Sequence, residues 1–403
     1  MVTEPKSFSD GPVRETLAGF SPESLRDQYR ADLFDDYLAF WDRHGIDREH
    51  GGFMCSLDHD GTQVSTDKNG WHQGRGLWAY SFLYNHFGGD QYLEIAREAR
   101  DFIVRHGRDE EGNWAITLDR EGNVLRKDGV GYAALFVAEG LQEYAEATGD
   151  TESWDLAVDS LHRGWERFSD PRATRFEDAP TSYPGIRSLG SHMVAIRVLT
   201  QMLEKGQDPK LESFAEQVVD AIVNRFWNPE YRLTNEFLTN DYQRPDDDNE
   251  DYVVLGHAME TLWMVLAEAV RLKDRTLLDL VGERLQRHIE VAWDDVYDGL
   301  FCGIHVNGET KTPKYLWTQE EVLVGCMILL EHTDLDWPEY WFGRVYRYVQ
   351  EKFPLKQYGH PMYILSADRK VTFQPRVSRK GNYHRPRHLM LNLLALERMI
   401  ART

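Results

Sequence analysis

The sequence predicts an all-α protein, an (α/α)6 barrel with short β-hairpins in the long loops at one end. Apolar residues recur at helical spacing over roughly a dozen segments. These segments come in pairs, and short loops alternate with longer loops that carry hairpin patterns. A helix pair cannot bury its apolar face alone, so repeated pairs must stack or close, and six pairs that close in a ring form this barrel. The long loops then gather at one end and wall a cleft.

The start of the first helix is marked by its residue types. Ser21 is a typical N-cap, and Pro22 takes the first helical position. Apolar residues then keep helical spacing from Leu25 to Trp41. Further helices are expected over residues 71–80, 92–106, 132–147, 151–168, 189–205, 210–226, 254–272, 275–292, 320–330, 339–352 and 389–401.

One turn pattern is repeated in the long loops. Residues 56–61 read SLDHDG and residues 117–122 read TLDREG, and each follows a short strand-like run. A strand that enters a turn of this composition predicts a hairpin. Related segments lie at 303–308 and 364–369.

The chain shows no linker that divides it. Residues 1–20 are polar and are expected to form a loose lead-in, and residues 21–403 are expected to form a single catalytic barrel domain. The acidic run at 245–251 is the nearest candidate for a boundary. It is interpreted as a solvated loop that leads into the helix at 254–272.

Composition and charge exclude several classes of protein. The net charge of −21 disfavours nucleic acid and anionic membranes as partners, because both would be repelled. The 12 Trp and 19 Tyr are enough for a core and for a cleft in which flat rings stack on sugars. The 3 cysteines are widely spaced and do not make a disulfide framework. No signal peptide and no long apolar run is present, so a soluble cytoplasmic protein is expected.

The segment GHAMETLW at 256–263 is the first candidate for chemistry. His257 and Glu260 lie three residues apart in a strongly helical run, so both side chains project from one face. An imidazole beside a carboxylate indicates proton transfer, in which the carboxylate holds one tautomer. The alternative is a partly exposed histidine with a neighbouring acid on a surface turn.

Arg75 lies four residues after Trp71 and three before Trp78, so one helix face offers a guanidinium flanked by indoles. Such a face suits a polyhydroxylated ligand or a developing oxyanion. A surface arginine stacked on tryptophan is an equally good interpretation. His192 opens an otherwise apolar helix, where a satisfied core histidine is the more common case.

Two further segments precede helices. Trp317 and Glu321 lie at the entrance of the helix predicted at 320–330, where they are suited to bind hydroxyls. The alternative is capping, with Thr318 as N-cap and Glu321 facing the helix dipole. His384 is expected in a loop before the last helix, pointing into the cleft. Its spacing to His388 is half of a metal site, but no carboxylate or cysteine lies nearby in sequence, so no metal is expected.

The order of these motifs resembles that of a known family. It runs WxQGRxLW around Arg75, then His192, GHAMExxW at 256–263, KxxWxxxE at 314–321 and HRPR at 384–387. This resembles the N-acylglucosamine 2-epimerase superfamily, which includes the cellobiose 2-epimerases and related sugar isomerases. The resemblance extends over residues 37–400, and GHxxE and HxPR are its most specific parts. It implies the (α/α)6 barrel independently of the helix count.

The resemblance also implies roles for the candidate residues. His257 and His384 are the implied acid–base pair, and Arg75 and His192 bind or polarise the sugar near C1 and O2. Glu260 and Glu321 are implied to orient the histidines. The residues expected to bind or orient the substrate with them are Trp317, Trp71, Trp78 and Arg387.

Three positions depart from the family pattern. Leu316 precedes Trp317 where two adjacent tryptophans are common, and residues 359–361 read GHP where the family often has Gly-Glu-Trp. Leu255 stands where a proline often precedes Gly-His. The first two lie in expected cleft loops and leave the choice of substrate open. The Gln-Gly-Arg around Arg75 is more similar to the acylglucosamine branch.

The predicted activity is inversion of C2 of an aldose or an N-acylated hexosamine, by ring opening and histidine-mediated proton transfer through an enediolate. Aldose–ketose isomerisation on the same scaffold is the main alternative. A glycoside hydrolase would use acids such as Asp58, Asp119, Glu236 and Asp251, and a carbohydrate-binding scaffold would use none. No cofactor is expected, the partner is a small sugar, and the protein is expected to be a monomer or a homodimer.

Overall fold

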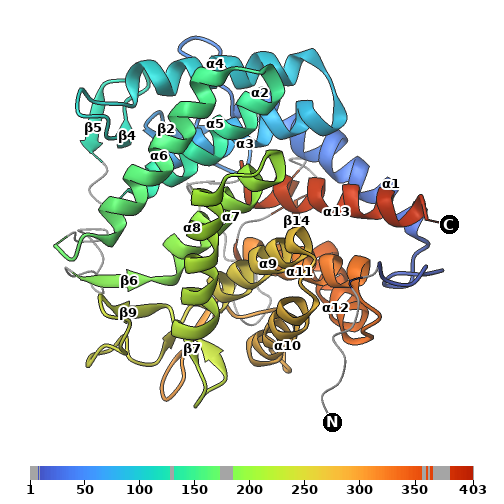
Figure 1. The fold of residues 1–403 in the computed structure, drawn as a ribbon. Helices are drawn as coiled ribbons and strands as arrows, with labels where there is room; N and C mark the ends of the chain where they lie inside the picture. Colours follow the sequence, from blue (N-terminus) through green and yellow to red (C-terminus); the bar gives the residue numbers. More distant parts are fainter. Residues whose placement is uncertain are drawn as a thin grey trace.

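The computed structural model describes residues 8, 10–127, 131–172, 185–355, 360–361, 364–365 and 382–402. In this part of the chain there are 12 helices, when two π-helical turns are counted with the helices they extend. Six inner helices form a ring: α3 (Gly70–Phe87), α5 (Tyr132–Thr148), α7 (Leu189–Lys205), α9 (Leu255–Leu272), α11 (Leu316–His332) and α13 (His384–Ile400). Each contacts the next, and α13 returns to α3 (Figure 1).

An outer helix packs on each inner one. The outer helices are α1 (Pro22–Ala31), which continues through η1 (Asp32–Leu38) into α2 (Ala39–His44), α4 (Asp90–His106), α6 (Thr151–Ser169), α8 (Pro209–Asp220), which continues into η2 (Ala221–Arg225), α10 (Arg275–Ala292) and α12 (Trp337–Lys352). The α1 helix covers α13, and the others cover α3, α5, α7, α9 and α11 in chain order. The predicted (α/α)6 barrel is confirmed.

The burial of the two rings explains this arrangement. The inner helix α5 buries residues on every face, whereas the outer helix α6 buries one stripe and keeps a polar face. A helix that is apolar all round must be enclosed, while an amphipathic helix belongs at the surface. The inner ring is therefore the core of the domain.

Short strands connect the loops at one end of the barrel. They are β1 (Ser56–Leu57), β2 (Gln63–Ser65), β3 (Lys68–Asn69), β4 (Ala115–Leu118), β5 (Val124–Lys127), β6 (Ile186–Ser188), β7 (Trp227–Asn228), β8 (Leu233–Thr234), β9 (Phe237–Thr239), β10 (Tyr252–Val253), β11 (Gly303–His305), β12 (Thr310–Lys311), β13 (Lys314–Tyr315), β14 (Pro354–Leu355), β15 (His360–Pro361) and β16 (Ile364–Leu365). The antiparallel pairs β3–β4, β6–β9, β10–β11 and β13–β16 each join the loop before one inner helix to a later loop. Figure 1 shows several of these strands along the left side of the molecule.

The repeated turn pattern forms the turns that it predicts. Gly61 donates its N–H to Asp58 at 3.0 Å, and Gly122 donates to Asp119 at 3.3 Å. Both glycines have positive φ, +87° and +103°, a conformation that favours glycine. The segment 303–308 lies in the β11–β12 hairpin. The fourth, 364–369, differs: β16 pairs with β13, and residues 366–369 lie outside the described residues.

A glutamine near the start of two inner helices holds the preceding loop. Gln73 on α3 donates to the carbonyl of Phe53 at 2.9 Å and accepts from its N–H at 2.7 Å. Gln319 on α11 makes the same pair of bonds to Leu300, both at 2.9 Å. These bonds pair backbone groups that are buried away from water. They fix the position of the loops around the end of the barrel.

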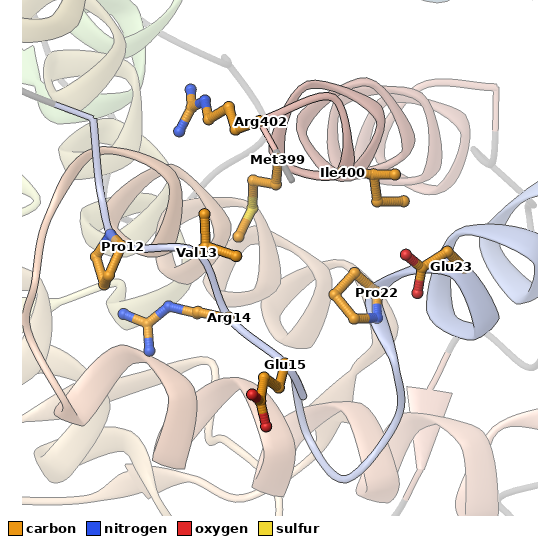
Figure 2. A pocket seen from close by; sticks show the side chains of 9 residues that line it. All are labelled: Pro12, Val13, Arg14, Glu15, Pro22, Glu23, Met399, Ile400 and Arg402. Carbon is orange, nitrogen blue, oxygen red and sulfur yellow. The ribbon is translucent and has the colours of Figure 1, made fainter.

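Residues 10–20, within the expected lead-in, are attached to the barrel. Arg14 pairs with Glu339 on α12 at 3.0 Å, and the side chain of Leu17 is fully buried. Residues 12–15 cross the C-terminal end of α13 and line a cavity of about 170 Å³ with Met399 and Arg402 (Figure 2). At about 1.5 Å per residue this cavity is roughly 24 Å along α13 from His384. It therefore lies far from the residues discussed below.

Among the described residues, no helix combines the length and apolarity that a bilayer crossing requires.

Candidate active site

The candidate residues lie at one end of the barrel because the inner helices begin there. Each occupies the first two turns of its helix: Trp71 and Arg75 on α3, His192 on α7, His257 and Glu260 on α9, Trp317 and Glu321 on α11, and His384 and Arg387 on α13. The N-terminal end of a helix carries unpaired N–H groups and a partial positive charge. Several such ends converge at this point, which favours an anion or a developing negative charge.

His257 is held by a carboxylate that the helix pattern did not indicate. Its Nδ1 lies 3.1 Å from both oxygens of Glu236, which is 3% exposed and lies between β8 and β9. The prediction that Glu260 orients His257 is corrected. Although both leave one face of α9, Glu260 is buried and turns to Arg387, while the partly exposed His257 turns to the loop.

His384 is the first residue of α13 and not part of a preceding loop. The start expected at residue 389 is wrong: Pro386 lies in the first turn of the helix, where proline is tolerated. The Nδ1 of His384 lies 2.7 Å from Oε1 of Glu321. The contact expected between Glu321 and a histidine is therefore present in the structure.

The indole of Trp317 lies against both imidazoles. Its ring centroid is 5.7 Å from that of His257 and 5.3 Å from that of His384. A Cβ at Gly256 would lie 2.3 Å from this indole, so only glycine permits the contact. Because α11 begins at Leu316, the capping alternative for Thr318 is wrong: the N-cap is Tyr315, and Glu321 lies in the second turn. Trp317 thus brings α9, α11 and α13 together.

Arg387 neutralises the two buried glutamates. It is fully buried, and its Nη2 donates to Glu260 at 2.5 Å and to Glu321 at 2.7 Å. Its guanidinium stacks on Tyr383 at 4.2 Å and on Trp263 at 5.0 Å. Glu260, Glu321 and His384 have the spacing of metal ligands, but the guanidinium already supplies positive charge to both carboxylates. Arg387 was expected to bind the substrate or to orient other residues of the site. Its full burial favours the orienting role.

Arg75 is 7% exposed and lies between two aromatic rings. Its guanidinium carbon is 4.1 Å from the centroid of Phe136 and 4.6 Å from that of Tyr383. The Oη of Tyr383 donates to both oxygens of Glu139 at 2.8 Å, which fixes the ring. Among the described residues the Nε of Arg75 has no hydrogen-bond partner. A fixed guanidinium of this kind is suited to bind an oxygen of a ligand.

His192 is fully buried, as expected for a histidine whose hydrogen bonds are satisfied within the core. Its Nδ1 lies 3.0 Å from the carbonyl of Ser188, and its Nε2 lies 3.3 Å from the hydroxyl of Tyr242. The rings of Trp165, Phe168 and Phe226 pack on its edges. His192 thus reaches the end of the barrel through Tyr242, which the sequence did not indicate.

The two tryptophans expected beside Arg75 differ in their surroundings. Trp71 is half-buried and packs edge-on against Tyr132 at 5.8 Å. Trp78 is fully buried and packs against Phe82 and Tyr383, so it is a core residue and not a surface for a ligand. The helix α3 is enclosed on most sides, so the spacing of three residues between Arg75 and Trp78 does not place both side chains in one cleft.

The environment of His384 sets its charge. Burial lowers its pKa to about 3; Glu260 opposes this shift, while Arg387 and Arg75 add to it. His384 is therefore neutral at neutral pH. Glu321, when ionised, only accepts hydrogen bonds, so the imidazole proton is assigned to Nδ1 and Nε2 keeps its lone pair.

This shift predicts a pH dependence of stability. The unfolded histidine has a pKa of about 6.5, so between pH 6.5 and 3 the unfolded chain binds a proton that folded His384 does not. Its stabilising contribution is complete above pH 6.5 and is lost as the pH falls. Urea unfolding of the wild-type protein should show a steeper loss between pH 7 and pH 5 than unfolding of His384→Asn. Equal slopes would contradict this prediction. Other histidines with lowered pKa values, among them His288 and His86 at about 4, contribute to the slope that remains.

The family model described as N-acylglucosamine 2-epimerase (GlcNAc 2-epimerase) matches residues 51–386. The N-acylglucosamine 2-epimerase of Bos taurus is 24% identical over 410 residues, covering 96% of this chain and 94% of that protein. The structure of a cellobiose 2-epimerase from Bacillus thermoamylovorans B4167 has a TM-score of 0.81 at 20% identity, covering 92% of this chain and 99% of that one. A D-mannose isomerase structure has a TM-score of 0.78 at 18% identity, covering 95% and 97%. The resemblance inferred from the motifs is confirmed. The chain belongs to the N-acylglucosamine 2-epimerase family and is an enzyme of the carbohydrate isomerase class.

Proposed function

We propose that this protein is a sugar 2-epimerase in which His257 and His384 exchange the proton at C2 of an open-chain aldose or N-acylated hexosamine. The observation that carries the proposal is the pair of imidazoles against Trp317, each held by its own buried carboxylate. A general base must be fixed in one tautomer and present its other nitrogen to the substrate. Glu236 and Glu321 fix the tautomers of His257 and His384.

The chemistry requires two such groups. The hydrogen at C2 is acidic only when C1 is a carbonyl, so the sugar ring must open first. One imidazole removes the proton from one face of C2, and the other returns a proton to the opposite face. His384 is neutral at neutral pH, so its Nε2 has the free lone pair that accepting a proton requires.

The enediolate that forms between these steps carries negative charge on oxygen. Arg75, held between Phe136 and Tyr383, offers a guanidinium whose position does not depend on the ligand. The N-terminal ends of the inner helices add partial positive charge at the same end of the barrel. Donors that are fixed before the charge develops cost no reorganisation during the reaction.

Aldose–ketose isomerisation is the second candidate. It begins with the same removal of the C2 proton, but the proton is returned to C1. The D-mannose isomerase structure that shares this fold supports this alternative as a variant of the same reaction. The pose of the enediolate, and not the type of the residues, decides between the two products.

Glycosidase chemistry fits the acids less well. Glu236 is bonded to His257, and Asp251 accepts from the N–H of Asn307 at 2.8 Å and contacts His305. Asp119 accepts N–H groups in its own turn, and such bonds lower its pKa, as they do for Asp251. A hydrolase needs an acid whose pKa is raised, so these two carboxylates are unsuited to that role.

The test is product analysis in deuterated water. Glucose, mannose, N-acetylglucosamine, N-acetylmannosamine and cellobiose are incubated with the enzyme and followed by NMR. A 2-epimer with deuterium at C2 is expected for the true substrate, and a ketose with deuterium at C1 would assign the isomerase. Methyl glycosides of the same sugars, which cannot open, are the control and should not exchange. If every sugar that is turned over keeps its C2 hydrogen without exchange, both the epimerase and the isomerase proposals are contradicted.

A further inference from the structure

A concave surface lies at the same end of the barrel, in the loop region between α8 and α9. It is a groove of about 520 Å³ between the β7–β8 hairpin and residues 242–250. The residues that define its chemistry are Trp227, Asn228, Asn235, Leu238, Tyr242 and Arg244. None of the histidines that contact Trp317 lines it.

Two deeply buried carboxamides line the groove. Asn235 is 2% exposed and Asn228 is 5% exposed. Among the described residues, Oδ1 of Asn235 and Nδ2 of Asn228 have no hydrogen-bond partner. Oδ1 of Asn228 accepts from the N–H of Glu230 at 3.0 Å, which fixes this amide with its nitrogen unpaired. Buried polar atoms without a partner are uncommon in folded proteins, so water or a ligand is expected to meet these two atoms.

The two side chains at the wall of the groove thus carry one unpaired acceptor and one unpaired donor. A hydroxyl group both donates and accepts, so adjacent sugar hydroxyls match this pair. Two half-buried aromatic residues, Trp227 and Tyr242, supply apolar surface beside the amides. Arg284 stacks on Trp227 at 4.1 Å and Arg187 stacks on Tyr242 at 4.6 Å, which holds both rings in place.

The charges of the lining disfavour an anionic ligand. Arg244 lies 3.3 Å from Glu230 and 3.8 Å from Glu250, and Arg225 lies 3.7 Å from Asp220. Both cations in the lining are thus paired with carboxylates of this chain. A phosphate or carboxylate ligand would have to displace these partners, whereas a neutral ligand would not.

Tyr242 connects the groove to the interior of the barrel. Its φ of +61° is rare for a bulky residue, and such strain persists only where the surroundings hold it. Its hydroxyl lies 3.3 Å from Nε2 of His192. A molecule in the groove would therefore contact Tyr242, the same residue whose hydroxyl meets His192.

We propose that this groove binds a neutral pyranose unit, with Asn235 and Asn228 pairing its hydroxyls and Trp227 and Tyr242 contacting its C–H faces. The occupant is either a free monosaccharide or the outer unit of an oligosaccharide whose other end lies at the histidines. Binding in the groove does not depend on turnover. A failure to bind would therefore reject this inference and leave the epimerase proposal untouched.

The experiment is saturation-transfer NMR of the full-length protein with methyl β-glucopyranoside and with cellobiose. The methyl glycoside has a closed ring and cannot be turned over by an enzyme that needs the open chain. The wild-type protein is expected to bind one of these probes, and Trp227→Ala and Asn235→Leu are each expected to weaken binding at least about tenfold, which corresponds to about 1.4 kcal/mol. Trp154→Ala, at a half-buried tryptophan on α6, is the matched control and should bind as the wild type does. Circular dichroism and the thermal midpoint confirm that each variant is folded.

The two probes separate the two sources of the ligand. Binding of the methyl glycoside that survives Arg75→Met identifies a site for a free monosaccharide. Binding of cellobiose alone, weakened by both Trp227→Ala and Arg75→Met, identifies the outer unit of an oligosaccharide. Absence of binding by both probes, or equal binding by the wild type and both groove variants, would overturn the proposal and leave the groove to ordered water.

Discussion

His384→Asn and His257→Asn are each expected to remain folded and to lose about 10²- to 10⁴-fold in turnover, the usual contribution of a general acid or base. Asparagine keeps an amide that can donate to Glu321 or Glu236, but it cannot take a proton from carbon. The loss should therefore appear in kcat, with little change in the unfolding midpoint at pH 7. Steady-state kinetics on the substrate found in the NMR panel and urea unfolding measure the two effects.

A matched control is His305→Asn. His305 contacts Asp251 at 3.1 Å, so it too is a histidine paired with a carboxylate in a long loop, but it does not contact Trp317. Its replacement should leave turnover within about twofold of wild type, which is the range expected for a surface substitution without a catalytic role. Near-wild-type turnover of either His257→Asn or His384→Asn would reject the two-base scheme.

Arg387→Met is expected to give the largest loss of stability, about 3–5 kcal/mol in the free energy of unfolding. The substitution keeps much of the side-chain volume but leaves Glu260 and Glu321 buried without the guanidinium that pairs with both. A buried charge that loses its partner costs far more than an exposed one. Urea unfolding at pH 7 measures the change.

Arg398→Met on the same helix is the control for this effect. Arg398 makes two bonds to Glu331, at 2.7 and 2.8 Å, but its side chain is 56% exposed. Glu331 is buried, but it keeps Arg402 as a second partner at 3.2 Å. Loss of the half-exposed Arg398 should therefore cost at most about 1 kcal/mol. If Arg387→Met costs no more than Arg398→Met, Arg387 does not compensate the buried carboxylates.

The sequence predicted the helices well where apolar periodicity was continuous. The helix predicted at 254–272 begins at Leu255 and ends at Leu272. Periodicity failed at the starts of α11 and α13, where the polar residues 318–321 and Pro386 interrupt the apolar pattern although they lie inside the helices. These errors matter for function, because they displaced Thr318 and His384 from their true positions in the first turn.

The sequence indicated most of the residues that the structure brings together at this end of the barrel, but it missed Glu236 and Tyr242 and gave few of the pairings. A spacing of three residues placed Glu260 on the same face as His257, but it cannot tell which neighbour each side chain meets. Glu236 reaches His257 from a loop 21 residues earlier in the chain, and Arg387 reaches Glu260 across 127 residues. Such contacts depend on how the inner helices close into a ring, which local sequence does not encode.

If the two histidines act on opposite faces of C2, the loss of one should leave proton exchange by the other intact. Each of the two epimers is incubated separately in deuterated water with the wild type, His257→Asn and His384→Asn, and C2 exchange is followed in the remaining substrate and in the product. Each variant should interconvert the epimers far more slowly than the wild type but should still exchange the C2 hydrogen of one epimer. The two variants should differ in which epimer they exchange. Exchange of both epimers by the same variant, or loss of exchange from both epimers in both variants, would contradict it.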